Sequence, residues 1–117
     1  MNNILCLELQ DQYFHAIVSG MKTVEGRLNS PKFKDLQVGM HISFRSQVMQ
    51  QTIICLIEEI SRYKSFKDML LAQGVGNMLP GVVNIEQAVD VYESFPGYKD
   101  KVILLGAVAI KIKKVEA

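Results

Sequence analysis

The chain has 117 residues, of which 49% are hydrophobic and 21% charged, and its formal net charge is +1. This length predicts one compact domain over residues 1–117, and the apolar fraction suffices for a core that needs neither a structural metal nor disulfides. The charge balance lacks the strong positive excess of proteins that bind nucleic acid non-specifically, so any contact with RNA would depend on a local pocket.

The N-terminal part of the chain predicts a strand, a helix and a second strand. Residues 3–9 form an apolar run typical of a strand that is buried on both faces at its start. Asp11 is a candidate N-cap for a helix over residues 12–19, where apolar residues recur at helical spacing, and Gly20 is well placed to end it. Alternation over residues 23–28 then predicts a short strand with two different faces.

The middle of the chain predicts two more strands followed by a helix. Residues 41–45 and 52–60 have strand character and are joined by a segment that suits a hairpin turn. Ser65 is the candidate N-cap of a helix over residues 66–73. Residues 74–81 predict a loop because they contain three glycines and a proline.

The C-terminal part of the chain predicts a helix and a closing strand. Apolar residues recur at helical intervals over residues 85–95, and residues 102–112 are strongly apolar and then alternate with lysines, which suits one long strand. The order of these elements lacks the regular strand–helix alternation of a doubly wound sheet. The sequence therefore predicts an α+β fold in which a mixed sheet curls into a barrel with flanking helices.

Two cysteines bear on metals and on the cellular compartment. Cys6 and Cys55 both lie inside apolar runs, which is typical of small buried residues in a reducing compartment. Together with the two histidines they lack the spacing of zinc ligands, so no metal or cofactor is expected. No apolar run approaches the roughly 20 residues that span a bilayer, and no signal peptide is visible, so we expect a cytoplasmic protein without membrane contact.

The densest polar cluster is predicted at the second strand. Alternation places Thr23, Glu25 and Arg27 on one face, with Lys22 at the entrance of the strand, while Gly26 on the other face permits close approach of a backbone or a ligand. Lysine, arginine and a carboxylate could together bind a phosphate or the polar edge of a base. The alternative is an exposed strand face with one cross-strand ion pair, which would contribute little to stability.

The same cluster resembles the signature of a known family. The string Gly20-x-Lys22-Thr23-x-Glu25-x-Arg27, which follows an aromatic helix, is similar to the GxKxxExR signature of ASCH domains. The resemblance continues over nearly the whole chain, in the stretches Leu36-x-x-Gly39-x-x-Ile42, Tyr63-x-Ser65-Phe66-x-x-Met69-Leu70, Leu79-Pro80-Gly81, Glu86-x-Ala88-Val89-x-x-Tyr92 and residues 102–112.

This resemblance implies a PUA-like β-barrel with a cleft beside the signature strand, where RNA or a nucleotide would bind. By the family pattern, Lys22, Glu25 and Arg27 line the cleft and Thr23 supports it. A branch of the superfamily consists of small amidohydrolases that deacetylate acetylcytidine. These enzymes are thought to use a lysine and a threonine of this strand and a glutamate from a later segment. Lys22 matches the lysine, but Glu25 stands at the position of the nucleophilic threonine, and the glutamate has no clear counterpart because residues 74–81 contain no acidic residue. If the chain is an enzyme on a modified nucleoside, Lys22 and Glu25 would have acid–base roles.

The sequence leaves the roles of several further features open. Lys111 and Lys113 share a predicted strand face that could extend a basic track for RNA or could protect an edge strand from aggregation. Tyr63, Tyr92 or Tyr98 could stack on a base. Residues 74–81 could form a lid or a simple connector. A protein-interaction module with a vestigial cleft is a third possibility, and the sequence identifies no protein partner.

Overall fold

The computed structural model describes residues 4–48 and 50–115 and contains a five-stranded sheet. The strands follow the spatial order β1-β3-β4-β5-β2, so β1 and β2 are the two edges. β1 pairs with β3 in parallel, and the other three pairings are antiparallel. The bounds are β1 (Leu5–Leu9), β2 (Val24–Leu28), β3 (His41–Ser46), β4 (Thr52–Tyr63) and β5 (Ala107–Lys114).

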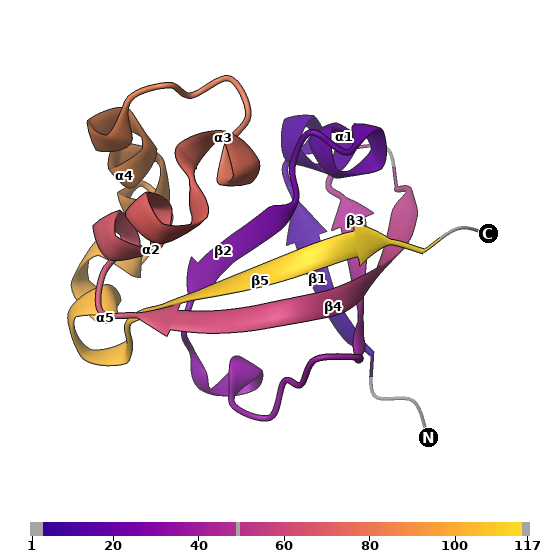
Figure 1. Ribbon diagram of the computed structural model, residues 1–117, viewed down its shortest axis with the longest axis horizontal. Helices are drawn as coiled ribbons and strands as arrows, with labels where there is room; N and C mark the ends of the chain where they lie inside the picture. Colours follow the sequence, from indigo (N-terminus) through magenta and orange to yellow (C-terminus); the bar gives the residue numbers. More distant parts are fainter. Residues whose placement is uncertain (1–3, 49, 116–117) are drawn as a thin grey trace.

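The helices divide between two regions of the sheet (Figure 1). α1 lies near the end of β3, whereas α2 to α5 gather together beside β2 and the start of β5. The predicted α+β class with a curled mixed sheet is confirmed, in the form of a half-barrel. The bounds are α1 (Asp11–Ser19), the short 3₁₀ turn η1 (Pro31–Phe33), α2 (Phe66–Gln73), α3 (Val75–Met78), α4 (Ile85–Glu93) and α5 (Tyr98–Leu105).

The start of α1 differs in detail from the prediction. Gln10 is the N-cap residue, and its carbonyl accepts from the N–H groups of Tyr13 and Phe14. Asp11 lies in the first turn, where a negative charge suits the positive end of the helix dipole. Its carboxylate accepts a hydrogen bond of 2.8 Å from the Ser46 hydroxyl. Asp11 therefore links α1 to the end of β3 rather than capping its own helix.

Two predictions for the C-terminal half are wrong. Within residues 74–81 the chain forms α3, a single helical turn, instead of a continuous loop. Residues 102–112 do not form one strand, because the first four belong to α5 and the strand begins only at Ala107. Gly106, with φ 76°, ends the helix and turns the chain into the sheet, a conformation that glycine adopts without strain.

Two hydrophobic cores lie on the two faces of β2 and β5. Val108, Ile110 and Ile112 point into the half-barrel, where they pack with residues of β1, β3, β4 and α1. Val24 and Leu28 point the other way, into a second core with α2 to α5. The unequal faces predicted for the signature strand therefore correspond to a helix-covered apolar face and an inner face that carries Glu25 and Arg27.

The prediction that both cysteines are buried is half wrong. Cys55 in the central strand β4 is fully buried, but Cys6 in the edge strand β1 is exposed. β1 buries Leu7 and Leu9 and exposes the residues between them, so only one of its faces is covered. No helix among the described residues is long and apolar enough to cross a membrane.

Candidate functional site

A cavity of about 510 Å³ lies where the half-barrel is open, between the edge strands β1 and β2. One wall is the continuous run of residues 6–10, and the opposite wall is the run of residues 25–27. A third wall comes from the α4–α5 region. Four aromatic residues line the cavity: Tyr13, Tyr92, Phe95 and Tyr98. This volume lies in the range of roughly 300–1,000 Å³ that is usual for small-molecule sites.

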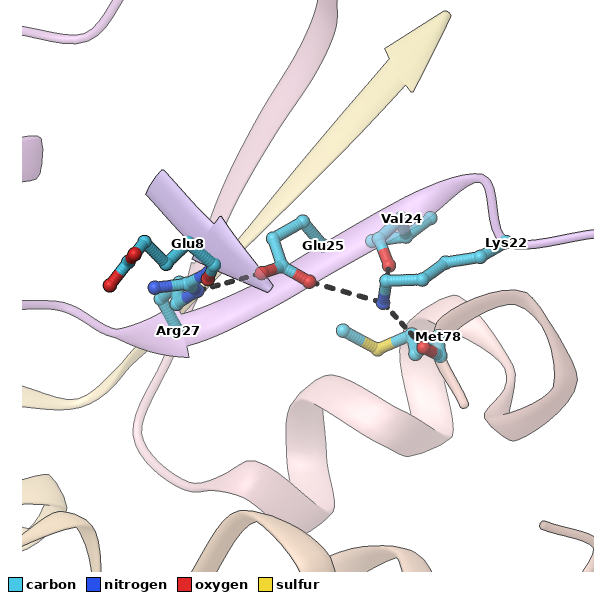
Figure 2. A network of polar contacts seen from close by, with 6 residues as sticks. All are labelled: Glu8, Lys22, Val24, Glu25, Arg27 and Met78. Carbon is cyan, nitrogen blue, oxygen red and sulfur yellow. Dashed lines mark hydrogen bonds and ion pairs between the residues drawn. The ribbon is translucent and has the colours of Figure 1, made fainter. Parts of the chain in front are cut away.

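Three of the predicted site residues form one chain of ion pairs in this cavity (Figure 2). The Lys22 ammonium lies 3.1 Å from Glu25 Oε1, and Arg27 Nε donates to Glu25 Oε2 at 2.7 Å. Arg27 Nη2 continues the chain to β1, where it donates to the carbonyl of Glu8 at 2.7 Å. The sequence thus predicted a cluster that the fold brings together, but not its link to β1.

Lys22 is enclosed by protein on all sides. Its side chain is only 1% exposed, and its ammonium also donates to the carbonyls of Val24, at 2.8 Å, and Met78, at 2.5 Å. These two carbonyls and Glu25 account for all three ammonium protons. Lys22 therefore ties β2 to the end of α3, and it has no proton left to donate to a ligand.

Burial and mutual attraction set the protonation of this cluster. Burial lowers the pKa of Lys22 below its usual value, and the neighbouring Glu25 partly opposes that shift. Burial alone would raise the pKa of Glu25, but the charges of Lys22 and Arg27 hold it below its ordinary range. The pKa of Arg27 is raised: burial lowers it, but the paired Glu25 carboxylate outweighs that effect. The Glu25 carboxyl is therefore stabilised in its ionised form between Lys22 and Arg27.

Arg27 is the part of the cluster that faces the open cavity. Its side chain is 19% exposed, compared with 5% for Glu25. A guanidinium has five N–H donors. Described residues accept from two of them, at Glu25 and at the Glu8 carbonyl. Arg27 is thus held at two points while further donors remain for a ligand.

The aromatic wall packs against the signature strand. Tyr92 and Tyr98 both stack on the ring of Phe66, with centroids 5.2 and 5.6 Å apart, respectively. A Cβ placed on Gly26 would lie only 2.6 Å from the Tyr92 hydroxyl, so this tyrosine fits because residue 26 is a glycine. Burial raises the pKa of Tyr92 well above its usual value, which keeps the hydroxyl protonated and able to donate.

The other predicted residues have different positions. Thr23 does not line the main cavity: its N–H donates to the Asn77 carbonyl and its carbonyl accepts from Ile112. It borders a second hollow of about 320 Å³ beside the end of α1. Lys111 is exposed and lies 3.9 Å from Glu59, a pairing within the outer surface of the sheet. The Tyr63 hydroxyl accepts a hydrogen bond of 2.7 Å from the Gln73 side-chain amide, and Tyr63 does not line the cavity.

Sequence reasoning missed Tyr13 and Phe95 as cavity residues. Tyr13 belongs to the apolar stripe of α1, but its ring also lies 5.6 Å from the Lys22 ammonium and borders the cavity. Phe95 follows α4 and packs edge-to-face on Tyr98 at 5.3 Å. Their helical spacing indicated burial only.

Across the described parts of the chain, no three histidine, cysteine or acidic side chains are grouped so as to hold a metal ion.

Comparison with known proteins identifies one matching family and several solved structures with a similar fold. The family model of the ASCH domain matches residues 7–116. The crystal structure of the hypothetical protein PH0355 has 34% identity and a TM-score of 0.85, covering 95% of this chain and 98% of the other. The NMR structure of PF0455 from Pyrococcus furiosus has 33% identity and a TM-score of 0.76, with coverages of 97% and 98%.

A more distant neighbour shares the fold alone. The crystal structure of the ASCH protein from Zymomonas mobilis has 19% identity and a TM-score of 0.64, covering 95% of this chain and 69% of the other. No curated protein is similar enough in sequence to count as a match.

Proposed function

Because this chain belongs to the ASCH domain family and has its PUA-like fold, we propose that it binds single-stranded RNA or a free nucleotide in the cavity between β1 and β2. The observation that carries the proposal is Arg27, which the Glu25 carboxylate and the Glu8 carbonyl orient at the mouth of an aromatic cavity. A planar guanidinium with free donors matches a phosphate or the acceptor edge of a base.

The aromatic lining supports the same class of ligand. Readers of single-stranded RNA stack unpaired bases on aromatic side chains and hydrogen-bond the base edges. Tyr98 and Phe95 line the cavity together with Arg27, and their mutual packing fixes their orientation. A stacked base contributes about 1–3 kcal/mol by alanine substitution in proteins of this kind. The site therefore does not require the large positive charge that the chain lacks.

In this proposal the residues of the signature have separate roles. Arg27 contacts the ligand, Glu25 orients Arg27, and Lys22 fixes Glu25 while joining β2 to α3. Thr23 supports the site through its backbone, since its N–H donates to the Asn77 carbonyl. The proposal takes residues 1–117 as one domain that acts in the cytoplasm, where the free Cys6 and Cys55 would stay reduced.

The test is a binding measurement with a matched pair of arginine variants. Fluorescence anisotropy with labelled RNA pentamers would compare the wild type with Arg27→Ala and with Arg45→Ala. Arg45 is an exposed arginine on β3 that pairs with Gln50 outside the cavity. We expect Arg27→Ala to weaken binding at least about tenfold, since it removes charge-assisted hydrogen bonds, and Arg45→Ala to leave it unchanged. Equal losses in both variants, or no binding by the wild type, would refute the proposal.

The second candidate is a small amidohydrolase acting on a modified nucleoside. The lowered pKa of Lys22 favours it, because a lysine base must be neutral for part of the time. The enclosure of the ammonium by Val24, Met78 and Glu25 argues against direct proton transfer to a substrate. We therefore rank this activity below binding.

Incubation with N4-acetylcytidine distinguishes the two candidates. We expect no acetate to be released, because the Lys22 ammonium is already engaged by Glu25 and by the Val24 and Met78 carbonyls. Steady acetate release that Lys22→Arg abolishes would replace binding with catalysis as the primary function. A heat-treated sample of the same protein controls for spontaneous hydrolysis.

A further inference from the structure

The edge of β1, not only its side chains, forms one wall of the cavity. Successive side chains of a strand point to opposite faces, yet residues 6–10 line the cavity without a gap. The Leu9 carbonyl accepts from Gln47, so the main-chain groups of Leu5, Leu7 and Leu9 face β3. The groups of Cys6 and Glu8 must then face the open side, and the Glu8 carbonyl indeed accepts from Arg27 there.

The edge of β2 forms the opposite wall in the same way. Thr23 accepts from Ile112 and Asn29 donates to Gly106, so the odd-numbered residues of this segment turn their main-chain groups toward β5. The even-numbered residues face the open side. There the Val24 carbonyl accepts from Lys22 and the Leu28 carbonyl from Ser30, both next to the cavity rather than in it. Gly26 is the even-numbered residue of β2 that lines the cavity, and by the same alternation its N–H and C=O are directed away from β5, toward the open side.

We infer that the cavity reads a single nucleobase through these main-chain groups, an inference that rests on the proposed function and names the part of the nucleotide that is recognised. On one wall the N–H and C=O of Gly26 would then be available to a ligand, and on the other wall the N–H groups of Cys6 and Glu8 and the carbonyl of Cys6. Nucleobases carry neighbouring donors and acceptors on their edges, which complement such peptide groups. The aromatic residues at the third wall stack on the face of the same base.

The contact between Arg27 and Glu8 favours a compact base over an extended peptide. A peptide strand could also pair with two free edges and would complete the barrel. It would have to run along the whole opening, but the guanidinium of Arg27 crosses that opening to reach the Glu8 carbonyl at 2.7 Å. A base needs only the space on one side of this crossing. The volume of about 510 Å³ also suits one nucleotide.

The test uses changes in the ligand, because main-chain groups cannot be removed by substitution. The ¹⁵N-labelled full chain would be titrated in NMR experiments with the four RNA homopentamers, an abasic pentamer and an alanine tripeptide. We expect at least one homopentamer to shift the amide signals of Cys6, Glu8 and Gly26 and to bind at least tenfold more tightly than the abasic pentamer. Arg45→Ala should reproduce the wild-type shifts.

The outcomes separate this inference from the proposed function. Equal binding of abasic and base-containing pentamers would overturn base reading while leaving RNA binding intact. Shifts of the three amides by the tripeptide, but by none of the RNAs, would replace the base with a peptide strand. If no RNA changes any signal, both the inference and the proposed function fail.

Discussion

At the scale of single residues, the signature divides into a structural half and an exposed half. Lys22 and Glu25 are almost completely buried, whereas Arg27 reaches the cavity. All three are linked by contacts of 3.1 Å or less, so a change at one of them alters the others. The two cations therefore differ in position: Lys22 is enclosed within the fold, and Arg27 is the one exposed to the cavity, where we propose that it contacts the ligand.

Substitution of Lys22 is expected to lower the stability of the folded protein. Lys22→Met removes the partner of the Met78 and Val24 carbonyls and leaves Glu25 with one cation. Breaking a buried ion pair costs about 3–5 kcal/mol, so the free energy of unfolding should fall by that amount. Urea denaturation measures it, with Lys67→Met at an exposed position of α2 as the control. A loss in Lys22→Met no larger than in the control would show that the network is not structural.

The lowered pKa of Glu25 predicts loss of stability in acid. A carboxylate whose folded pKa lies below its ordinary value of 4.5 contributes stability that is present above about pH 4.5 and lost as the pH falls through the folded pKa. Urea denaturation of the wild type and of Glu25→Gln between about pH 7 and 3 tests this. The difference in free energy of unfolding between the two proteins should shrink below pH 4.5. If the free energies of unfolding of the two proteins differed by the same amount at every pH, the lowered pKa of Glu25 would be contradicted.

The sequence predicted the charged residues of the site better than their partners. Lys22, Glu25 and Arg27 were identified from strand alternation and from the family signature. One acceptor of Lys22 is the Met78 carbonyl, 56 residues away in the chain. Any residue type can supply a main-chain carbonyl, so the sequence does not indicate which one will accept. The contact between Arg27 and the Glu8 carbonyl could not be predicted for the same reason. Local patterns specify side chains on one strand but not the main chain that later packs against them.

At the scale of elements, the boundary between α5 and β5 was the main failure. Ile103 and Leu104 look like strand residues, yet they are 79% and 90% exposed on a helix. Hydrophobic periodicity detects burial, so apolar residues on an exposed helical face mislead it. The strands and helices with a clear buried face, such as β4 and α4, were predicted within a few residues.

Gly106 sets that boundary, and its replacement should be costly. Its φ of 76° disfavours other residues, and a Cβ there would lie 2.5 Å from the Tyr63 carbonyl oxygen. Gly106→Ala should lower the free energy of unfolding by about 3 kcal/mol or more, from backbone strain together with overlap. Gly39→Ala is the matched control, because Gly39 has φ 95° but no atom near its Cβ position. There we expect a loss of about 1 kcal/mol. The stability of both variants can be measured by thermal or urea unfolding. Equal losses of stability in the two variants would show that overlap with the Tyr63 carbonyl contributes nothing.

At the scale of the whole molecule, the cavity exists because the edge strands β1 and β2 do not pair with each other. β1 and β2 lie at opposite ends of the strand order but face each other across the cavity, linked by Arg27. The order of the predicted elements and the family resemblance, which extends over nearly the whole chain, both predicted the curled sheet. The open seam depends on which strand edges remain unpaired, and no residue pattern in one sequence specifies that.

The weak overall charge predicts a shallow salt dependence of RNA binding. The net charge is +1, and besides the enclosed Lys22 the cationic residues that line the cavity are Arg27 and Lys32. With about two phosphate contacts on single strands, affinity should fall by less than about tenfold between roughly 50 and 200 mM salt. Anisotropy titrations at several salt concentrations measure the slope. A loss of a thousandfold would indicate that RNA binds along an extended basic surface instead.

The central claim is that RNA binds between β1 and β2, and crosslinking tests it most directly. A single-stranded RNA pentamer containing 4-thiouridine would be irradiated with the protein and the crosslinked residues identified by mass spectrometry. We predict crosslinks at the cavity residues Tyr92, Phe95 or Tyr98, and their loss in Arg27→Ala. Crosslinks confined to the outer face of the sheet, around Lys111 and Lys113, would contradict the assignment of this cavity as the binding site.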